Sequence, residues 1–275
     1  AGTNGGGLHC PRRPIGSGNG ADSVHSRSSH SSGMRFGFAP HPRAPQEKEE
    51  DPIGYVDFED EDFDESEDED TTAPCFYDWR QYYPELQLLI DNFDQILEEA
   101  QSLIGWKAWP EYHFEEGGGD DWKVFPFLHT FPATSPENAV WVGPTCRKCP
   151  KTVSLLRQLP NLRTALFSRL GSGTKLSTHR GWADLANFVL RCHLSLKIPD
   201  PPESCGVWVE GQIQHHRDKE IIVFDDSKLH KAFNTSSGER LVLIFDMIRP
   251  NDIPQGRAKG PHTPELDNFI EKAFR

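Results

Sequence analysis

Short apolar runs bounded by turn residues dominate the second half of the chain. Runs of this length and spacing predict β-strands in an antiparallel sandwich or barrel, because residues such as Gly, Pro, Asn and Asp interrupt them at regular intervals. The runs are "ALFSRL" (165–170), "NFVLRCHLSLKI" (187–198), "GVWVEG" (206–211), "EIIVFDD" (220–226) and "ERLVLIFDMIR" (239–249).

Helical spacing of apolar residues precedes these strands and returns at the end of the chain. The stretch 83–104 predicts a helix that Gly105 ends, with an apolar face of Leu86, Ile90, Phe93 and Leu97. A shorter helix over 150–159 buries Thr152, Leu155, Leu156 and Leu159. A last helix covers 263–274. Between them, "WKVFPFLHTF" is β-prone, and its Pro126 predicts an edge or a bend.

Charge separates the chain into two parts. Residues 1–70 carry 6 Lys and Arg against 16 Asp and Glu, a net charge of −10 out of −13 for the whole chain. Residues 1–46 are rich in Gly, Ser, Pro and His, and residues 47–70 are an acidic run. Such a composition cannot bury enough apolar surface to fold. The sequence therefore predicts a disordered acidic tail, which either solvates the protein or docks a basic partner, before one domain over 71–275.

Composition also excludes several classes of protein. The folded part is nearly neutral and has no basic patch, so we expect no nucleic-acid binding. No apolar run approaches the length of a membrane span, and the N-terminus does not resemble a signal peptide. The compartment stays open. The single CxxC pair, Cys146 and Cys149, lacks the second pair of a zinc site. It could be two reduced thiols, a local disulfide or a redox dithiol.

One predicted strand alternates strictly between apolar and polar residues. Its even positions are apolar, and they are Leu190, Cys192, Leu194, Leu196 and Ile198. Its odd positions are polar, and they are Arg191, His193, Ser195 and Lys197. Period-two alternation places the two sets on opposite faces of the sheet. The polar face lies either in water or inside a barrel that holds a polar ligand.

Arg240 opens a strand that is otherwise nearly all aliphatic. It has apolar neighbours whichever face of that strand is buried, so its guanidinium needs an anionic partner. A planar carboxylate is the natural match. Asp246 is six residues further along the same strand, roughly 20 Å away at about 3.3 Å per residue, which is too far to pair with Arg240. The partner is then another side chain or the carboxylate of a ligand.

Two histidines, His179 and His230, flank predicted strands and could meet at one metal ion. The usual Fe(II) pattern places an acidic residue two positions after the first His, and this chain has Gly181 there. Spacing alone therefore leaves ordinary histidines as an alternative. We interpret the residues between the apolar runs of the stretch 220–246 as a polar turn with His230 at its edge. Three further histidines are interpreted as surface residues, and they are His215, His216 and His262.

Five segments in one order resemble the aspartyl/asparaginyl β-hydroxylase family. They are "CRKCPKT", "FSRLGSGTKLSTHRG", "LRCHLSLKIP", "IIVFDDSKLHKAF" and "ERLVLIFDMIRPN". The resemblance covers about residues 75–255. It implies a mainly β fold, a double-stranded β-helix (a jelly-roll or cupin-like barrel) with flanking α-helices, that uses Fe(II), O₂ and 2-oxoglutarate.

The resemblance also implies roles for individual residues. His179 and His230 match the family's two iron ligands, and Gly181 matches a position where this family has water in place of a carboxylate. The residues that match co-substrate contacts with 2-oxoglutarate are Ser168, Arg191, His193 and Arg240. The implied substrate is the β-carbon of Asp or Asn in a protein or peptide, with a lipid acyl chain as an alternative.

The chain departs from the family pattern beside the implied metal site. The stretch between His179 and Arg191 is a few residues longer than in well-studied animal relatives, and Asp184 within it is a possible extra ligand. Two readings outside the enzyme class also stay open. The barrel could be a non-catalytic module that binds a ligand, or a scaffold for an interaction protein with an acidic tail.

Overall fold

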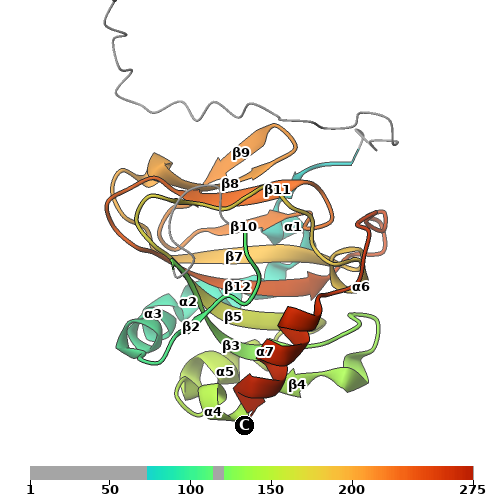
Figure 1. Cartoon of the computed structure of the whole chain (residues 1–275), viewed down its shortest axis with the longest axis horizontal. Coiled ribbons are helices and arrows are strands. Elements are labelled where there is room, and N and C mark those ends of the chain that lie inside the picture. Colours follow the sequence, from blue (N-terminus) through green and yellow to red (C-terminus); the bar gives the residue numbers. More distant parts are fainter. Residues whose placement is uncertain (1–72, 114–120, 275) are drawn as a thin grey trace, which may run out of the picture. The chain divides into compact units, whose positions relative to one another are not determined.

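The computed structural model describes residues 73–113 and 121–274. The predicted tail of residues 1–70 lies outside the described residues. All five predicted strands form, and they belong to two sheets that face each other as a sandwich (Figure 1). This architecture is the mainly β, jelly-roll type that the sequence predicts.

The larger sheet carries most of the long strands. In the described part of the chain it has eight strands, and every pairing is antiparallel. Across the sheet they are β1 (Phe76–Tyr77), β10 (Ile221–Phe224), β7 (Val189–Lys197), β12 (Arg240–Ile248), β5 (Leu162–Leu170), β3 (Trp122–His129) and β2 (Lys107–Ala108), with β4 (Val140–Trp141) also paired to β3. The register shifts between Pro126 and Leu128 where β3 meets β5, which confirms the predicted bend.

The smaller sheet contains a strand that the sequence did not predict. Over the described residues its order is β6 (Thr174–Lys175), β11 (His230–Asn234), β8 (Cys205–Val209) and β9 (Gln212–His215). The interpretation of a polar turn between the two apolar runs is therefore wrong, because β11, a fully buried strand of the smaller sheet, lies there. Its polar residues hid it, since His230 and Asn234 find hydrogen-bond partners inside the protein.

The predicted N-terminal helix is broken into three pieces. A 3₁₀ turn (Pro84–Leu86) leads into α2 (Gln87–Asp91), and α3 (Phe93–Ser102) follows. Asn92 interrupts the helix, and its side-chain amide donates to the Leu88 carbonyl at 2.8 Å. The break rotates the apolar stripe, so Ile90 and Leu97 are only partly buried. The buried face consists of Leu86, Leu89, Phe93, Ile96 and Ala100.

Two further helices, α5 (Pro150–Leu156) and α7 (Pro264–Phe274), lie close to their predicted places. The sequence did not predict the short helices α1 (Trp79–Tyr82), α4 (Gly143–Cys146) and α6 (Ala183–Ala186), nor the 3₁₀ turns at Pro136–Asn138 and Pro202–Ser204. The predicted face of the helix at 150–159 is fully buried. Among the described residues, no helix is both long and apolar enough to cross a bilayer.

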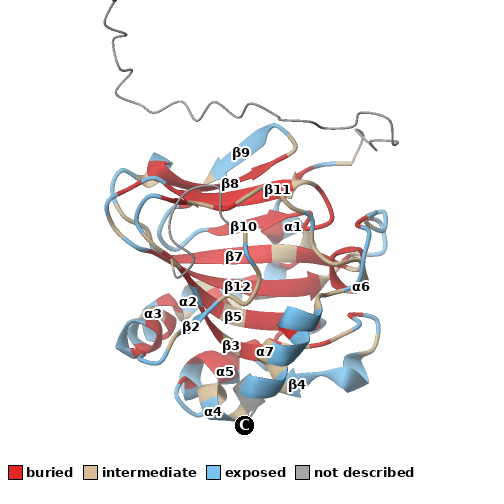
Figure 2. Cartoon of the chain, in the orientation of Figure 1, coloured by how far each residue is buried: buried red, intermediate tan, exposed pale blue. Residues whose placement is uncertain are grey.

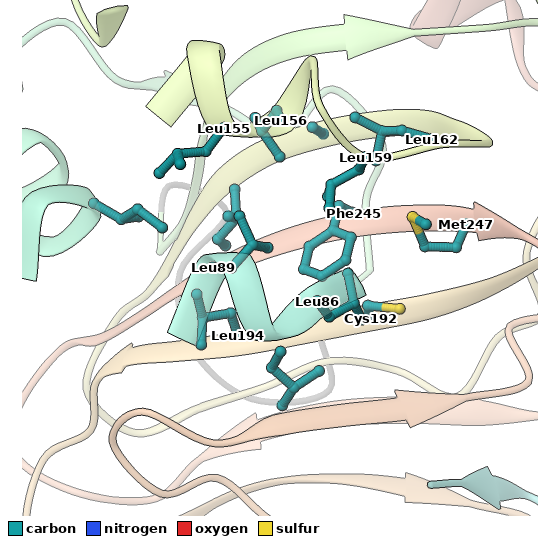
Figure 3. Close-up of a cluster of buried hydrophobic side chains, with 14 of the residues drawn as sticks. Leu86, Leu89, Leu155, Leu156, Leu159, Leu162, Cys192, Leu194, Phe245 and Met247 are labelled. Atoms are coloured by element: carbon teal, nitrogen blue, oxygen red, sulfur yellow. The ribbon is translucent and has the colours of Figure 1, made fainter. Parts of the chain in front are cut away.

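The main hydrophobic core lies between the outer face of the larger sheet and the helices. Figure 3 shows side chains from α2, α5, β7 and β12 meeting in this cluster. They include Leu86, Leu89, Leu155, Leu156, Cys192, Leu194, Phe245 and Met247. Most residues of β7 and β12 are buried (Figure 2), with Arg191 and Ile248 partly exposed, so both faces of these strands are covered. The polar odd face of β7 therefore lies inside the sandwich, except for exposed Lys197 at its end.

Candidate active site

His179 lies directly opposite His230 of β11, in an isolated bridge outside the named strands. Each backbone N–H donates to the other residue's carbonyl, at 2.9 and 2.8 Å, in an antiparallel bridge. Their rings are 4.5 Å apart between centroids. Residues opposite each other in an antiparallel pair project their side chains to the same face. The fold thus brings together the two histidines that are 51 residues apart in sequence.

Hydrogen bonds fix the tautomer of both rings. The Nδ1 atom of His179 lies 2.8 Å from the Ser177 carbonyl, and Nδ1 of His230 lies 2.9 Å from the Lys228 carbonyl. A carbonyl only accepts, so Nδ1 carries the proton in each ring and Nε2 keeps a free lone pair. Burial lowers the pKa of His179 to about 4 and that of His230 well below its ordinary value. Both rings therefore present the neutral nitrogen that metal ligands require.

The position of the missing acidic residue is filled by Asp226. A Cβ atom on Gly181 would lie inside van der Waals contact with Asp226 Oδ2, and 2.7 Å from the Ala186 methyl carbon. Asp226 Oδ1 is 3.3 Å from the Nε2 lone pair of His230. Two acceptors face each other at that point, and the cation beside them is the Arg191 guanidinium, whose Nη1 approaches the same oxygen. Burial raises the pKa of Asp226 to about 7.

Arg191 joins two buried carboxylates on the inner face of the larger sheet. It donates from Nε and Nη2 to Asp246 at 2.9 and 3.1 Å, and its Nη1 lies 2.5 Å from Asp226 Oδ1. Register explains the contact, because Arg191 and Thr164 are the cross-strand neighbours of Asp246. Thr164 also donates to Asp246. Burial alone would lower the pKa of Arg191, but Asp226 and Asp246 raise it above its ordinary value.

Arg240 is 1% exposed, and no carboxylate pairs with it among the described residues. Its Nη2 donates to Ser168 Oγ at 3.3 Å, and Trp122 Nε1 donates to the same oxygen at 3.1 Å. Its Nε and Nη1 atoms are buried without a hydrogen-bond partner in the described part of the chain. Burial lowers the pKa of Arg240 to about 10, which leaves the side chain charged at neutral pH. The expected absence of a pairing with Asp246 is confirmed.

His193 pairs with a histidine that the sequence placed at the surface. His216 is completely buried, so that interpretation is wrong, and its Nε2 lies 3.2 Å from Nδ1 of His193. His216 follows the edge strand β9, where the charged residues around it made burial unexpected. The ring of Phe224 lies 5.2 Å from that of His193 and 5.3 Å from that of His230. The Phe224 ring therefore contacts both His193 of this pair and His230.

His262 is also wrongly placed at the surface, since it is only partly exposed and lies between two carboxylates. Its Nδ1 is 2.6 Å from Asp184, and its Nε2 is 3.0 Å from Asp267 at the start of α7. Asp184 thus pairs with His262, and within the described part of the chain it makes no hydrogen bond to His179 or His230. His215 is half-buried at the end of β9.

A small, largely apolar cavity of about 70 Å³ opens beside the Arg191 network. Most residues that line the cavity come from β3, β5, the segment around Trp182 and α7. The apolar lining includes Trp109, Leu166, Trp182, Leu266, Phe269 and Ile270. Its polar groups at the Arg191 end, Thr164, Arg191 and Asp246, are hydrogen-bonded to one another. This end of the cavity therefore offers little to a polar ligand.

Cysteine chemistry does not contribute to this site. The five described cysteines, Cys146 and Cys149 among them, are free thiols. Burial raises the pKa of Cys149 to about 12, so it is not a reactive thiolate. Among the described residues, no group of three or more His, Cys, Asp or Glu side chains is arranged to hold a metal ion. The candidate metal site is the two-histidine pair with Asp226 beside it.

Sequence reasoning missed several residues of this region. Asp226, Asp246 and His216 are polar residues that become buried through pairing between distant segments. A local clue existed for Asp226, since it lies four residues before His230. Another missed residue is His113, whose ring stacks on His179 at 4.6 Å between centroids. His113 follows no strand pattern, so the sequence gave no reason to place it there.

The family described as Aspartyl/Asparaginyl beta-hydroxylase has a sequence model that matches residues 90–250. This range is more than half of the chain, includes all six predicted site residues and ends before α7. The chain is also 35% identical over 133 residues to "Ornithine lipid ester-linked acyl 2-hydroxylase" of Rhizobium tropici, which covers 48% of this chain and 43% of that protein.

Another relative is "Aspartate beta-hydroxylase domain-containing protein 2" of Mus musculus, 34% identical over 178 residues, or 61% of this chain and 48% of that protein. The chain thus spans less than half the length of either relative. A solved oxidoreductase of the 2OG-Fe(II) oxygenase family from Burkholderia pseudomallei is 13% identical, with a TM-score of 0.43 over 66% of this chain and 95% of that one. A likeness that weak adds nothing to the family match.

Proposed function

Because the chain belongs to the aspartyl/asparaginyl β-hydroxylase family, we propose that it is an Fe(II)- and 2-oxoglutarate-dependent dioxygenase that hydroxylates an unactivated C–H bond. The activity belongs to the domain proposed for residues 71–275. The observation that carries this proposal is Arg240, a buried cation without a carboxylate partner among the described residues. A charge buried in this way is costly unless a ligand supplies the anion.

His179 and His230 fit the metal. Their free Nε2 lone pairs lie on one face of the antiparallel bridge, and their Nδ1 protons are held by backbone carbonyls, as in metal-binding histidines generally. Fe(II) bound there would activate O₂ for attack on a C–H bond, with oxidative decarboxylation of the co-substrate. Asp226 lies where a side chain at position 181 would project, and it would face the metal from outside the pair of ligands.

The inner face of the larger sheet would bind 2-oxoglutarate. Arg240 would hold one carboxylate through its unpartnered donors, while Ser168 Oγ accepts from its Nη2 and keeps the guanidinium in place. His193 Nε2 and Ser195 Oγ are buried without partners in the described part of the chain, so they are further candidate contacts. Arg191 also remains a predicted contact. Its donors already serve Asp226 and Asp246, so its main effect would be to keep these carboxylates in place.

For the substrate, we propose the β-carbon of an Asp or Asn side chain in a protein or peptide. The family's description supports this choice.

A second candidate is a lipid acyl chain, and the cavity beside Arg191 favours it. The lining is largely apolar, which suits an acyl chain better than a charged or amide side chain. The polar end of the cavity is satisfied internally, so it has little to offer an Asp or Asn side chain. The relative from Rhizobium tropici is named for acyl hydroxylation.

Succinate release tests the enzymatic proposal. The full chain is purified anaerobically and supplied with Fe(II), 2-oxoglutarate, ascorbate and O₂, and the control is the double variant His179→Ala/His230→Ala. Succinate that depends on both histidines supports a dioxygenase. If the unmodified chain neither retains iron nor releases succinate, the result supports a binding module instead.

Two substrate arms then separate the candidates. Peptides that contain Asp or Asn and acyl lipids of graded chain length are added separately, and product mass is measured. A gain of one oxygen on the peptide supports the first candidate, and a gain on the acyl chain supports the second. The variant Leu266→Trp narrows the cavity from α7, and it should reduce turnover of the acyl chain selectively.

A further inference from the structure

His193 and His216 connect the two sheets through a single hydrogen bond. His193 lies on the inner face of β7, and His216 follows β9 of the smaller sheet, where its backbone N–H donates to the Cys205 carbonyl at 2.9 Å. Their rings are nearly parallel, with 10° between planes, and Nδ1 of His193 is 3.2 Å from Nε2 of His216. Both side chains are buried. Nothing in the sequence comparison with the family assigns a role to His216.

The remaining ring nitrogens of the pair are left without partners. His193 Nε2 and His216 Nδ1 are buried and have no hydrogen-bond partner among the described residues. A histidine pair is a poor choice for merely filling the core. A buried ring nitrogen without a hydrogen bond costs more free energy of folding than an apolar group of similar shape. The unpartnered Nε2 of His193 is therefore a candidate contact for a polar ligand.

Proton counting links the tautomers of the two rings. Burial lowers the pKa of both histidines well below the ordinary value, so each ring is neutral and carries one proton. Only one proton can occupy the bond between them. If His193 donates, its Nε2 is bare. If His216 donates, His193 must carry its own proton on Nε2.

We propose that His216 is a positioning residue that donates its Nε2 proton to His193 Nδ1, and so holds His193 as a hydrogen-bond donor toward a carboxylate of 2-oxoglutarate. The inference rests on the proposed function, since it assumes that Arg240 and His193 face this co-substrate. A carboxylate only accepts hydrogen bonds, so it selects the arrangement in which His193 Nε2 is protonated. His216 Nδ1 is then a bare acceptor, which is easier to leave unpaired than a buried N–H.

Two substitutions separate this role from simple packing. His216→Gln keeps a donor, because the terminal amide occupies nearly the place of Nε2, whereas His216→Phe keeps the ring shape without any donor. The affinity of the full chain for 2-oxoglutarate is measured by calorimetry with Mn(II) in place of Fe(II). Loss of one hydrogen bond that supports a charged ligand should weaken binding about tenfold in the Phe variant, and the Gln variant should stay within about threefold of the unmodified protein.

Kinetics give a second readout that a packing defect would not reproduce. The Phe variant should raise KM for 2-oxoglutarate about tenfold while kcat at saturating co-substrate stays nearly constant, because the substitution removes binding and leaves the metal site intact. A general packing defect would lower kcat, thermal stability and metal retention together in both variants. That pattern would overturn the proposal.

The tautomer itself is visible in the ¹⁵N spectrum of protein labelled at histidine, because protonated and bare ring nitrogens resonate at well-separated shifts. His193 signals are assigned from the variant His193→Gln. On addition of 2-oxoglutarate to the Zn(II) form, Nε2 of His193 should be protonated and Nδ1 bare. The reverse assignment would overturn the proposal even if 2-oxoglutarate binds, and failure of the unmodified protein to bind 2-oxoglutarate at all would overturn the proposed function and this inference together.

Discussion

The two faces of β7, β12, β5 and β3 differ as sharply as any two regions of the molecule. The outer face is apolar, and it packs against α2, α3 and α5 in one cluster. The inner face carries buried charges and hydroxyl groups, and several of their atoms lack partners among the described residues. Both faces belong to the same strands, and they differ only in which residue of each alternating pair points inward.

The difference assigns stability and ligand binding to opposite faces. Apolar burial on the outer face contributes to folding whether or not a ligand is present. Buried polar atoms on the inner face gain their full value only when a ligand completes their hydrogen bonds. Substitutions at neighbouring positions of one strand should therefore separate the two properties.

Phe245→Ala on β12 should have the largest effect on folding. Phe245 is fully buried in the outer cluster (Figure 3), and truncation of a buried Phe costs about 3–5 kcal/mol because it leaves a cavity. Urea unfolding measures the loss. The matched control is the adjacent inner residue, Ile244→Val, which should cost only about 0.5–1.5 kcal/mol. Equal losses for the two variants would contradict the separation of the two faces.

Arg240→Met on the inner face should weaken ligand binding strongly without lowering the free energy of unfolding. Removal of a charged group that binds a carboxylate costs about 2–5 kcal/mol, so affinity for 2-oxoglutarate should fall by about 30-fold or more. The free energy of unfolding should stay constant or rise, because Met fills a similar volume without a buried unpaired charge. Calorimetry and urea unfolding are compared on the same variant, with retained metal as control. A strongly destabilised variant would show that Arg240 has a structural partner instead.

The sequence predicted those features of the fold that depend on local pattern. Strict alternation located β7 and its two faces, and helical spacing located α5 and α7. The aliphatic neighbours of Arg240 indicated a buried guanidinium that lacks a partner on its own strand. The family resemblance then connected Arg240 with His179 and His230, which the fold places inside one sandwich.

Features that depend on pairing between distant segments could not be predicted. The charges of Arg191 and Asp246 gave no hint that strand register would place them side by side. β11 was hidden because its polar residues are satisfied from other elements. His216 follows the same rule, because its charged neighbours in sequence predict exposure whereas its partner His193 lies on another strand. Local polarity predicts exposure only where no internal partner exists, and partners are decided by tertiary structure.

Gly181→Ala should disturb the inner region by steric conflict. The added methyl group would meet Asp226 and the Ala186 side chain, and such overpacking costs about 1–3 kcal/mol. Since Asp226 lies beside His230, iron affinity should fall as well. Urea unfolding and metal analysis measure the two effects. The double variant Gly181→Ala/Asp226→Ala should recover part of the unfolding free energy, and the absence of any coupling between the two substitutions would count against this contact.

Substitution of His262 should have the smallest and most local effect. His262 contacts Asp184 and Asp267, and so holds α7 beside the apolar cavity. Burial alone would lower the pKa of His262. Hydrogen bonding and the charge of Asp184 raise this pKa above its ordinary value of 6.5. A raised pKa means that its contribution is complete below pH 6.5 and is lost as the pH rises through the pKa of the folded protein. A partly exposed pair of this kind contributes no more than about 1 kcal/mol. Amide exchange in α7, corrected for intrinsic rates, should therefore quicken between pH 6 and 8.5, while exchange in β12 stays constant. In His262→Gln the change with pH should disappear, and an unaltered pH dependence in that variant would show that another group holds α7.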